Sequence, residues 1–492
     1  MTTHLSLMQM EALRAKAVAM LESAFARLTE LHVIPCPRFH PYLRVGRDYY
    51  GMDIMTLAAF KEFEETLKEF FPTRFVPTTA GGFPAEYPNR YGFDLLEASI
   101  AALTHFDEEY VATSATVEQK IVDLAEMLQQ DNRSVICARA VTRMTTMDGE
   151  VLHLGDIIVH PSKHLAMDEI FLNLIPGATS AYNRQRPHVF ARPESVVATT
   201  VTGVDDVYTL QQQAHVRLNR FVLATRLLTG CTSQNAFQIY GQVASVPTLG
   251  PDLNLFEHSD IQLGVRPAVL SQPDAVAIQH ILDLLDSVKY IDDNNVVSSL
   301  QMAIEKFTQV FGSNGWSEDI LDLATALEAA ISGSETTDIV LRLSMRASLL
   351  LATDTDPPDD LFLDVKLLYD LRSRLVHGTS LTIKELTRLL GRLSVSRVGA
   401  PPGMQIALAV DRLRDIVRRA ILARVVFAAE DLWPLHRTPQ VSIDWCLANP
   451  VRAKCWRVFW QMRLGNAGAD VAARAATKLA DSLMDDYPGK NV

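Results

Sequence analysis

From about residue 274 to residue 429, this 492-residue chain carries one amphipathic helical pattern after another, with no strand pattern between them. Within each pattern, apolar residues recur every three or four positions, which is the spacing of one face of an α-helix. Proline-containing loops, such as those at 354–360 and 399–403, separate successive patterns because proline ends a helix. We therefore predict an all-helical region with helices at 274–290, 296–312, 317–332, 337–351, 359–377, 382–394 and 404–429.

The preceding part of the chain mixes helical and strand patterns. An uninterrupted helix is predicted at 5–32, and Thr116 to Gln119 has the form of a capping box that begins another helix. Residues 33–93 are rich in Pro, Gly and aromatic residues, so we expect them to be irregular. Two β-branched segments flank Asp148-Gly149 and predict a β-hairpin. The expected elements are helices near 95–103 and at 211–229, and strands at 134–144, 151–160, 194–203 and 237–245.

These patterns predict an α+β fold that is mostly α-helical. The predicted parts are a mixed α+β region at 1–268, a helical bundle at 269–435, and a helical tail at 436–492 that packs on the bundle. Within the bundle, Ser317 followed by Glu318 and Asp319 predicts a helix start, because acidic side chains are favourable at the positive end of the helix dipole.

The composition is that of a globular protein without a general affinity for polyanions. Hydrophobic residues make up 48% of the chain, and the formal charge is −12, so any nucleic-acid site must be local. Apolar stretches fall short of the roughly 20 residues that span a membrane, and the N-terminus has no export signal. We therefore expect no membrane partner. The five cysteines are scattered, which predicts reduced thiols and a cytoplasmic location.

The segment LLYDLRSRLVHG (367–378) is the most informative for function. Arg372 has only apolar or aromatic neighbours three and four positions away, so a group outside its own helix must compensate its charge. Arg374 has Asp370 four residues before it and is expected to form an ordinary surface pair. His377 precedes Gly378, a typical residue after a helix end, where the dipole favours a positive charge.

This segment resembles the signature of the HEPN superfamily, an Arg followed after four to six residues by a His. The signature is Arg372-Ser-Arg-Leu-Val-His377 in this chain. Four blocks in order resemble the Apea-like HEPN group: ALEAAI (326–331), LRLSMRASLLL (341–351), YDLRSRLVHG (369–378) and LRDIVRRAIL (413–422). The resemblance covers roughly residues 275–430. It implies a helical bundle that dimerises and, in many members, cleaves RNA without a metal or another cofactor.

The resemblance also implies roles for three residues. His377 would transfer protons, Arg372 would stabilise charge on the phosphate, and Ser373 would contribute a hydrogen bond. Active superfamily members often carry Asn, Asp or His at the position of Ser373, so this chain departs from the pattern there. Arg372 and His377 are about 140° apart around a helix, so two copies of the chain would have to share one site. Proteins of this arrangement act in anti-phage defence or as toxins, and the N-terminal region would bind an unknown trigger.

Local charge favours an RNA partner for the same part of the chain. Residues 366–424 contain 12 Lys or Arg and four Asp or Glu, in a protein that is acidic overall. Positive charge of this kind contacts phosphate groups. The candidate RNA contacts are Arg374, Arg388, Arg392, Arg418 and Arg419.

Non-catalytic interpretations stay open beside the nuclease hypothesis. Arg372 could pair with Glu328, whose own helix neighbours are apolar, and Arg346 could complete a buried structural network with them. The bundle would then act only in assembly. A third, weaker interpretation is a metal site in the mixed region, formed by His153, His160, His164, Asp156 and Asp168.

Overall fold

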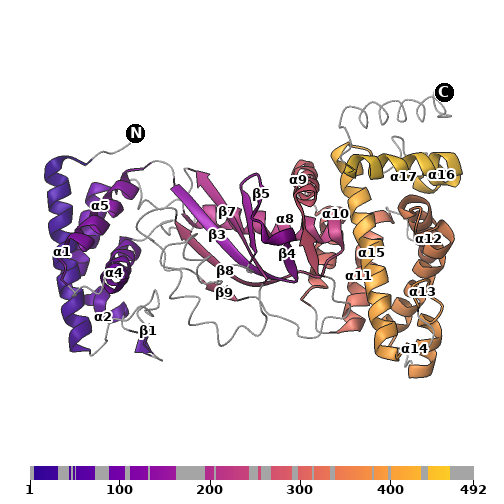
Figure 1. Ribbon diagram of the computed structural model, residues 1–492, viewed down its shortest axis with the longest axis horizontal. Coiled ribbons are helices and arrows are strands. Elements are labelled where there is room, and N and C mark those ends of the chain that lie inside the picture. Colours follow the sequence, from indigo (N-terminus) through magenta and orange to yellow (C-terminus); the bar gives the residue numbers. More distant parts are fainter. Residues whose placement is uncertain are drawn as a thin grey trace. The chain divides into compact units, whose positions relative to one another are not determined.

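The structure is a computed structural model (Figure 1) with two compact units. The first unit comprises Met1–Asn219 and Asn235–Phe256, and the second comprises Arg220–Gln234 and Glu257–Val492. The chain passes from the first unit to the second between Phe256 and Glu257, and residues 220–234 also belong to the second unit. The residues that the structure describes are 5–31, 44–45, 48–49, 51–72, 88–105, 111–130, 133–161, 194–203, 207–242, 253–255, 267–290, 297–312, 315–332, 338–378, 382–396, 400–433 and 442–465.

A helical core forms one part of the first unit. Phe60, Phe63 and Leu67 of α3 are fully buried in this core, and their spacing of three and four residues is the reason that the segment is helical. The expectation that residues 33–93 are irregular is therefore wrong, because this range contains α2, α3 and the beginning of α4. The elements are α1 (Leu7–Glu30), β1 (Arg44–Val45), β2 (Asp48–Tyr49), α2 (Gly51–Thr56), α3 (Ala58–Phe70), α4 (Pro88–His105) and α5 (Ala115–Gln129).

Side-chain caps determine where two of these helices begin. Ser6 caps α1 in a capping box with Gln9, as a helix predicted from about residue 5 requires. At α5 the cap is Ser114, whose hydroxyl accepts a hydrogen bond from the backbone N–H of Val117. Thr116 is already inside the helix, so the predicted capping box there is wrong, although the helix itself is present.

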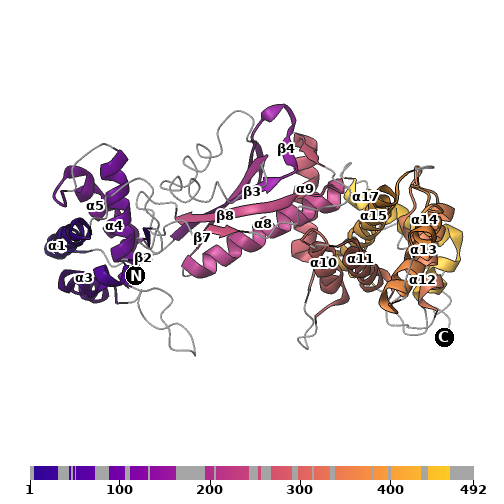
Figure 2. The same cartoon turned by 90° about the horizontal axis from the view of Figure 1, so that it is seen from below.

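Strands of the first unit form a six-stranded sheet in the order β5-β6-β7-β3-β8-β9. Helix α8 (Val207–Thr229) runs along the sheet in Figure 2. Fully buried Arg139 of β3 donates a hydrogen bond to Asn219 of α8 at 2.8 Å, which ties the helix to the sheet. The strands are β3 (Arg133–Thr142), β5 (Leu152–Leu154), β6 (Ile157–Pro161), β7 (Ser195–Gly203), β8 (Gln234–Gln242) and β9 (Leu253–Leu255).

The predicted hairpin between residues 134–144 and 151–160 is wrong, because β7 lies between its two expected strands. Ala198 of β7 pairs with Ala138 of β3 on one side and with Ile158 of β6 on the other. Asp148 and Gly149 lie instead in a 3-10 turn after the short strand β4 (Met144–Thr146). A strand inside a sheet pairs with a neighbour on each side, and turn residues in the sequence do not predict which distant segment is that neighbour.

The second unit contains a helical bundle in which α15, a helix of 28 residues, packs against α10, α11, α12, α14 and α17 (Figure 1). Apolar residues of these helices, including Leu323, Leu350 and Phe427, are fully buried. The elements are β10 (Ala268–Leu270), α9 (Gln272–Ser287), α10 (Ser299–Gln309), α11 (Trp316–Ile331), α12 (Ile339–Leu351), α13 (Pro358–Val376), α14 (Ile383–Leu390), α15 (Pro402–Ala429), α16 (Ile443–Ala448) and α17 (Pro450–Leu464).

The mostly helical α+β fold class is confirmed, and the predicted bundle helices are found within a few residues of their expected ends. One start differs: α11 is capped at Gly315, and Ser317 lies within its first turn together with Glu318 and Asp319. Within the described residues, no helix has the length and apolar character that crossing a membrane requires.

Candidate active site

The candidate site lies at the C-terminal end of α13. This helix begins after Pro357, and Asp359 and Asp360 occupy its first turn, where the dipole favours acidic groups. It ends with His377 as the C-cap residue, whose N–H donates a hydrogen bond to the Ser373 carbonyl at 3.1 Å. Gly378 has φ of +61°, a left-handed conformation that favours glycine, and it turns the chain away immediately after the histidine.

Arg372 points from α13 toward α11. Its guanidinium lies 3.7 Å from the carboxylate of Glu328 and 5.4 Å from the centre of the Tyr369 ring. The Nε atom is buried and has no hydrogen-bond partner, although 29% of the side chain is exposed. Glu328 is the partner that the sequence suggested for Arg372. The pair is held loosely, because 3.7 Å exceeds the length of a hydrogen bond.

Glu328 is in an environment that disfavours its charge. Burial raises the pKa of this carboxyl group, and the positive charge of Arg372 opposes that effect without cancelling it. The Oε1 atom is buried and has no hydrogen-bond partner. The Glu328–Arg372 contact is therefore an incomplete ion pair, in which both groups keep unused hydrogen-bonding capacity.

His377 and Ser373 lie on the accessible side of the same helix end. The imidazole is exposed, Ser373 is half-buried, and Val376 beside them is 52% exposed. Arg372 contacts α11, whereas His377 extends from the helix end into solvent. A single chain therefore does not direct both side chains at one point, in agreement with their angular separation.

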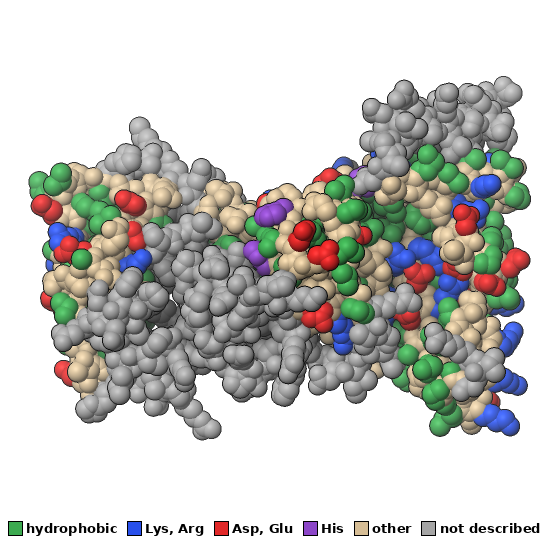
Figure 3. All heavy atoms as spheres, in the orientation of Figure 1, with side chains coloured by type: hydrophobic (Ala, Val, Ile, Leu, Met, Phe, Trp, Pro, Cys, Tyr) green, Lys and Arg blue, Asp and Glu red, His purple; other side chains and the backbone are tan. Residues whose placement is uncertain are grey.

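Three of the candidate RNA contacts lie at the surface of α13 and of the segment that follows it. Arg374 is bound to Asp370 at 3.2 Å in the expected solvated pair. Arg388 of α14 and Arg392 just after it are exposed, as is Lys384. Figure 3 shows Lys and Arg side chains at the lower right, where Figure 1 places α14.

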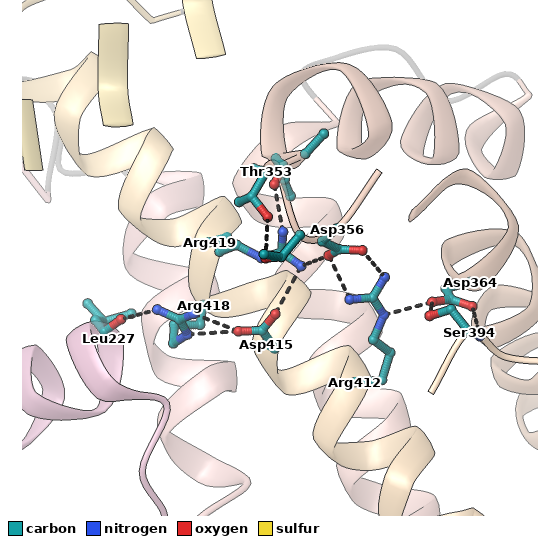
Figure 4. A network of polar contacts seen from close by, with 12 residues as sticks. Leu227, Thr353, Asp356, Asp364, Ser394, Arg412, Asp415, Arg418 and Arg419 are labelled. Carbon is teal, nitrogen blue, oxygen red and sulfur yellow. Dashed lines mark hydrogen bonds and ion pairs between the residues drawn. The ribbon is translucent and has the colours of Figure 1, made fainter. Parts of the chain in front are cut away.

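The other two candidates, Arg418 and Arg419 of α15, bind protein groups. Arg419 is 6% exposed and donates to the Leu351 carbonyl at 2.6 Å and to Asp356 at 2.5 Å. Arg418 donates to Asp415 at 2.6 Å and to the Leu227 carbonyl at 2.7 Å (Figure 4). The expectation that these two residues contact RNA is corrected, because their guanidinium groups are occupied inside the bundle.

A buried polar network joins α15 to the start of α13, and the sequence did not reveal it. Arg412 binds Asp356 through two parallel hydrogen bonds of 2.7 and 2.8 Å, and its Nε donates to Asp364 at 2.7 Å. Asp364 also accepts a hydrogen bond from the backbone N–H of Ser394 at 2.9 Å. In Figure 4 these groups point toward one another from α15, α13 and the loop before α13.

The carboxylates of this network are held in the ionised form. Burial raises the pKa of Asp356, but hydrogen bonds from Arg412 and Arg419 outweigh burial and bring it below the ordinary value. Burial likewise raises the pKa of Asp415, and the charges of Arg418 and Arg419 reverse that effect. These arginines therefore have carboxylate partners at hydrogen-bond distance, which Arg372 lacks.

Arg346 does not join Glu328 in a network. It is 2% exposed, and its Nε donates to Asp444 of α16 at 2.6 Å. It also donates to the carbonyls of Ile331 and Ser332 at the end of α11. Arg346 therefore forms a buried network as predicted, but its carboxylate partner is Asp444 and not Glu328.

The candidate metal residues are not gathered around one point in the described structure. His153 is exposed and His160 is half-buried on neighbouring strands, while Asp156 pairs with Arg217. His164 and Asp168 lie outside the described residues. In the part of the chain that the structure describes, no three His, Cys, Asp or Glu side chains are grouped to hold a metal ion.

Comparison with protein-family models, with curated proteins and with solved structures finds no match for this chain. The resemblance to HEPN proteins thus stays a prediction from the residues that carry it.

Proposed function

We propose that this protein is a metal-independent endoribonuclease whose site forms where the α13 ends of two copies meet. The observation that carries this proposal is that one helix end bears both an exposed imidazole, His377, and an arginine whose charge is incompletely compensated, Arg372. A two-fold axis at this end would bring two His377 and two Arg372 side chains around one phosphate. The exposed arginines of and after α14 extend the positive surface for an RNA strand.

The residue types suit cleavage by transesterification. The ribose 2′-oxygen attacks the adjacent phosphorus, the bond from phosphorus to the 5′-oxygen breaks, and the products carry a 2′,3′-cyclic phosphate and a 5′-hydroxyl. One neutral His377 imidazole accepts the 2′-hydroxyl proton, and a protonated His377 of the partner subunit gives a proton to the leaving oxygen. Arg372 donates hydrogen bonds to the phosphate oxygens as negative charge builds on them.

Incomplete pairing is what makes Arg372 suitable for this role. A guanidinium in short, parallel hydrogen bonds to a carboxylate would have to break them before it could bind phosphate. At 3.7 Å from Glu328, Arg372 has little to lose by turning toward an anion. Ser373, half-buried one position further along α13, has a hydroxyl that can donate another hydrogen bond to the phosphate.

The test is an RNA cleavage assay with EDTA in excess, using the full-length protein. Arg372→Ala and His377→Ala should each lower the cleavage rate by about 100-fold or more. Lys366→Ala is the matched control, because it removes an exposed positive charge from the same helix at a position that is not a candidate RNA contact, and its rate should change by a few-fold at most. Equal rates for the wild type and Arg372→Ala would contradict the proposal.

Growth of cells that express the protein gives a second readout. An effector of anti-phage defence or a toxin should arrest growth when the wild type is induced, and His377→Ala should remove the arrest at equal protein level. The same cultures provide a fractionation test of the cytoplasmic location. Arrest that occurs only in strains that also express a candidate ligand of the first unit would identify that ligand as the trigger.

The Glu328–Arg372 contact favours one alternative, in which the bundle has a purely assembling role. In that case the pair would serve packing, and the end of α13 would act as a contact surface between copies. A wild type that is folded and dimeric but inert toward RNA under every trigger tried would support this alternative. Size-exclusion chromatography with light scattering supplies the required control for the dimer.

A further inference from the structure

Arg424 differs from the other arginines of α15 in its partners. Each of the others has a carboxylate oxygen within 3.5 Å, and they are Arg412, Arg414, Arg418 and Arg419. Among the described residues, none forms an ion pair with Arg424, and its Nε atom is buried without a hydrogen-bond partner. Its helical neighbours Ile421 and Phe427 are fully buried, so the charge of Arg424 lies on an apolar side of α15.

The surroundings of Arg424 disfavour its positive charge. Burial lowers the pKa of this guanidinium to about 9, and no charge of the described residues opposes the effect. Burial acts in the same direction on Arg412, but Asp356 and Asp364 reverse it and raise the pKa above its ordinary value. Arg424 is therefore still a cation at neutral pH, in a position where a cation without an anion is unfavourable.

Ser299 and Trp433 lie beside the guanidinium of Arg424. The Nη2 atom is 3.5 Å from the Ser299 hydroxyl, which is the upper limit for a hydrogen bond. The guanidinium carbon lies over the Trp433 ring, 4.3 Å from its centre, and this ring stacks on Phe427. An aromatic ring covers a face of a guanidinium and leaves the N–H groups at its edge for other acceptors.

The guanidinium of Arg424 also lies at the positive end of a second helix, because Ser299 is the first residue of α10. This helix has 11 residues and no acidic side chain in its first turn. The Ser298 hydroxyl accepts the backbone N–H of Gln301, whereas the N–H groups of Ser299 and Leu300 have no acceptor among the described residues. A half-buried cation and a helix N-terminus thus meet without an anion, although both favour one.

We propose that Arg424, Ser299 and the first backbone N–H groups of α10 bind the phosphate group of a small molecule. Phosphate oxygens accept hydrogen bonds from the edge of a guanidinium, from a hydroxyl and from N–H groups at a helix N-terminus. The negative charge of the phosphate compensates the cation that the described residues leave unpaired. All of these donors belong to α10 and α15, which pack against each other in the second unit. The site does not depend on whether the protein cleaves RNA.

Calorimetric titration of the full-length protein with inorganic phosphate, at constant ionic strength, tests the site. The wild type should bind with a Kd of about 1 mM, an affinity suited to a few hydrogen bonds at one group. Arg424→Leu should weaken binding by about 10-fold or more, because the cation is lost. Ser299→Ala should weaken it by about 3-fold, because one hydroxyl is lost. A wild type that does not bind at about 50 mM phosphate would overturn the proposal.

Lys454→Gln is the matched control for a general effect of charge. Lys454 is an exposed cation of α17 in the same unit, so its loss changes the net charge as Arg424→Leu does. The affinity for phosphate should stay within about 2-fold of the wild type. Equal weakening in Lys454→Gln and Arg424→Leu would show that phosphate responds only to net charge, against the proposal.

Adenosine 5′-monophosphate, titrated beside inorganic phosphate, distinguishes two sources of the phosphate group. Equal affinities would show that the phosphate group alone is recognised, and tighter binding of the nucleotide would identify a nucleotide as the ligand. In both cases Arg424→Leu should remove the binding. Nucleotide binding that persists unchanged in Arg424→Leu, together with no binding of inorganic phosphate, would contradict the assignment of the site.

Thermal unfolding gives a readout independent of the titration. Arg424→Leu places an apolar side chain among apolar neighbours, so without phosphate it should unfold at a temperature no lower than the wild type. Phosphate at about 10 mM should raise the unfolding temperature of the wild type by about 2–4 °C over chloride of equal ionic strength, and should not raise that of Arg424→Leu. An equal rise in both proteins would overturn the proposal. A lower unfolding temperature of Arg424→Leu without phosphate would do so too, by showing that the Trp433 contact already compensates Arg424.

Discussion

Arg412 and Arg419 of α15 and Arg372 near the end of α13 lie in one helical bundle but differ in how their charges are paired. Arg412 and Arg419 are less than a tenth exposed, and short hydrogen bonds to Asp356 join both of them to the same carboxylate. Arg372 is more exposed, and its carboxylate partner Glu328 lies at 3.7 Å, beyond the length of a hydrogen bond. The difference separates charges that hold helices together from a charge that is available to a ligand.

The number and distance of the acceptors around each guanidinium distinguish these two cases, whereas the residue type is the same in both. A buried guanidinium is stable only if several acceptors meet its rigid fork, and α15 with the loop before α13 supplies them. At the end of α13 the one carboxylate, that of Glu328, is itself disfavoured as an ion. Arg372 is therefore incompletely paired, on the same helix end as the exposed His377.

The largest effect is expected on the α15 side. Arg412→Leu leaves Asp356 without its two-bond partner and Asp364 as a buried carboxylate without a cation at 2.7 Å. We expect a loss of about 3–5 kcal/mol in the free energy of unfolding, measured by urea denaturation at pH 7. Arg372→Ala, measured in parallel, should change this free energy by about 1 kcal/mol or less. Similar losses for the two variants would break the comparison.

A smaller effect is expected from pH at Glu328. Its folded pKa is raised, so the folded state binds more protons than the unfolded state once the pH exceeds about 4. The ionised carboxyl therefore lowers stability as the pH rises from the unfolded to the folded pKa, and Glu328→Gln removes that contribution. The stability of Glu328→Gln relative to the wild type should thus rise with pH, by about 1 kcal/mol at most.

The pKa values of Asp356 and Asp415 are shifted in the opposite direction from that of Glu328, so the pH test is specific to Glu328. Their folded pKa values are lowered, so their contribution is complete above about pH 4 and is lost as the pH falls through the folded values. Both proteins share this acid loss, and it cancels in the difference between them. A flat difference across the pH series would show that Glu328 is not in the described environment.

The smallest effect is expected for Arg374→Ala. Its bond to Asp370 at 3.2 Å is a surface pair four residues apart on one helix, which contributes about 0.3–0.5 kcal/mol. Urea denaturation at low and high salt should show a loss of this size that fades as salt screens the pair. A loss that does not change with salt would mean that the side chain serves packing instead.

Local features of the sequence were sufficient to predict the end of α13. The glycine after His377 has the left-handed conformation that its position suggested, and Arg372 found its partner in Glu328, a carboxyl on the apolar face of a neighbouring helix. Both predictions depended on helical periodicity, which places residues on faces with little ambiguity. The same periodicity gave the bundle helices.

Long-range pairing was not predictable from the same signals. Arg346 binds Asp444, which lies 98 residues further along the chain, and neither residue indicates the other in the sequence. A count of positive charges likewise could not tell that Arg418 and Arg419 bind carboxylates and carbonyls inside the bundle. Asp364, an acid at an apolar helix position among buried leucines, was the one local signal of a buried network.

The network of α15 also has a mechanical consequence. An unbroken series of bonds runs from the Leu227 carbonyl in the last turn of α8 through Arg418, Asp415, Arg419, Asp356 and Arg412 to Asp364 of α13 (Figure 4). A shift of the last turn of α8 would therefore displace groups that are bonded to α13, the helix that carries His377 at its C-terminal end.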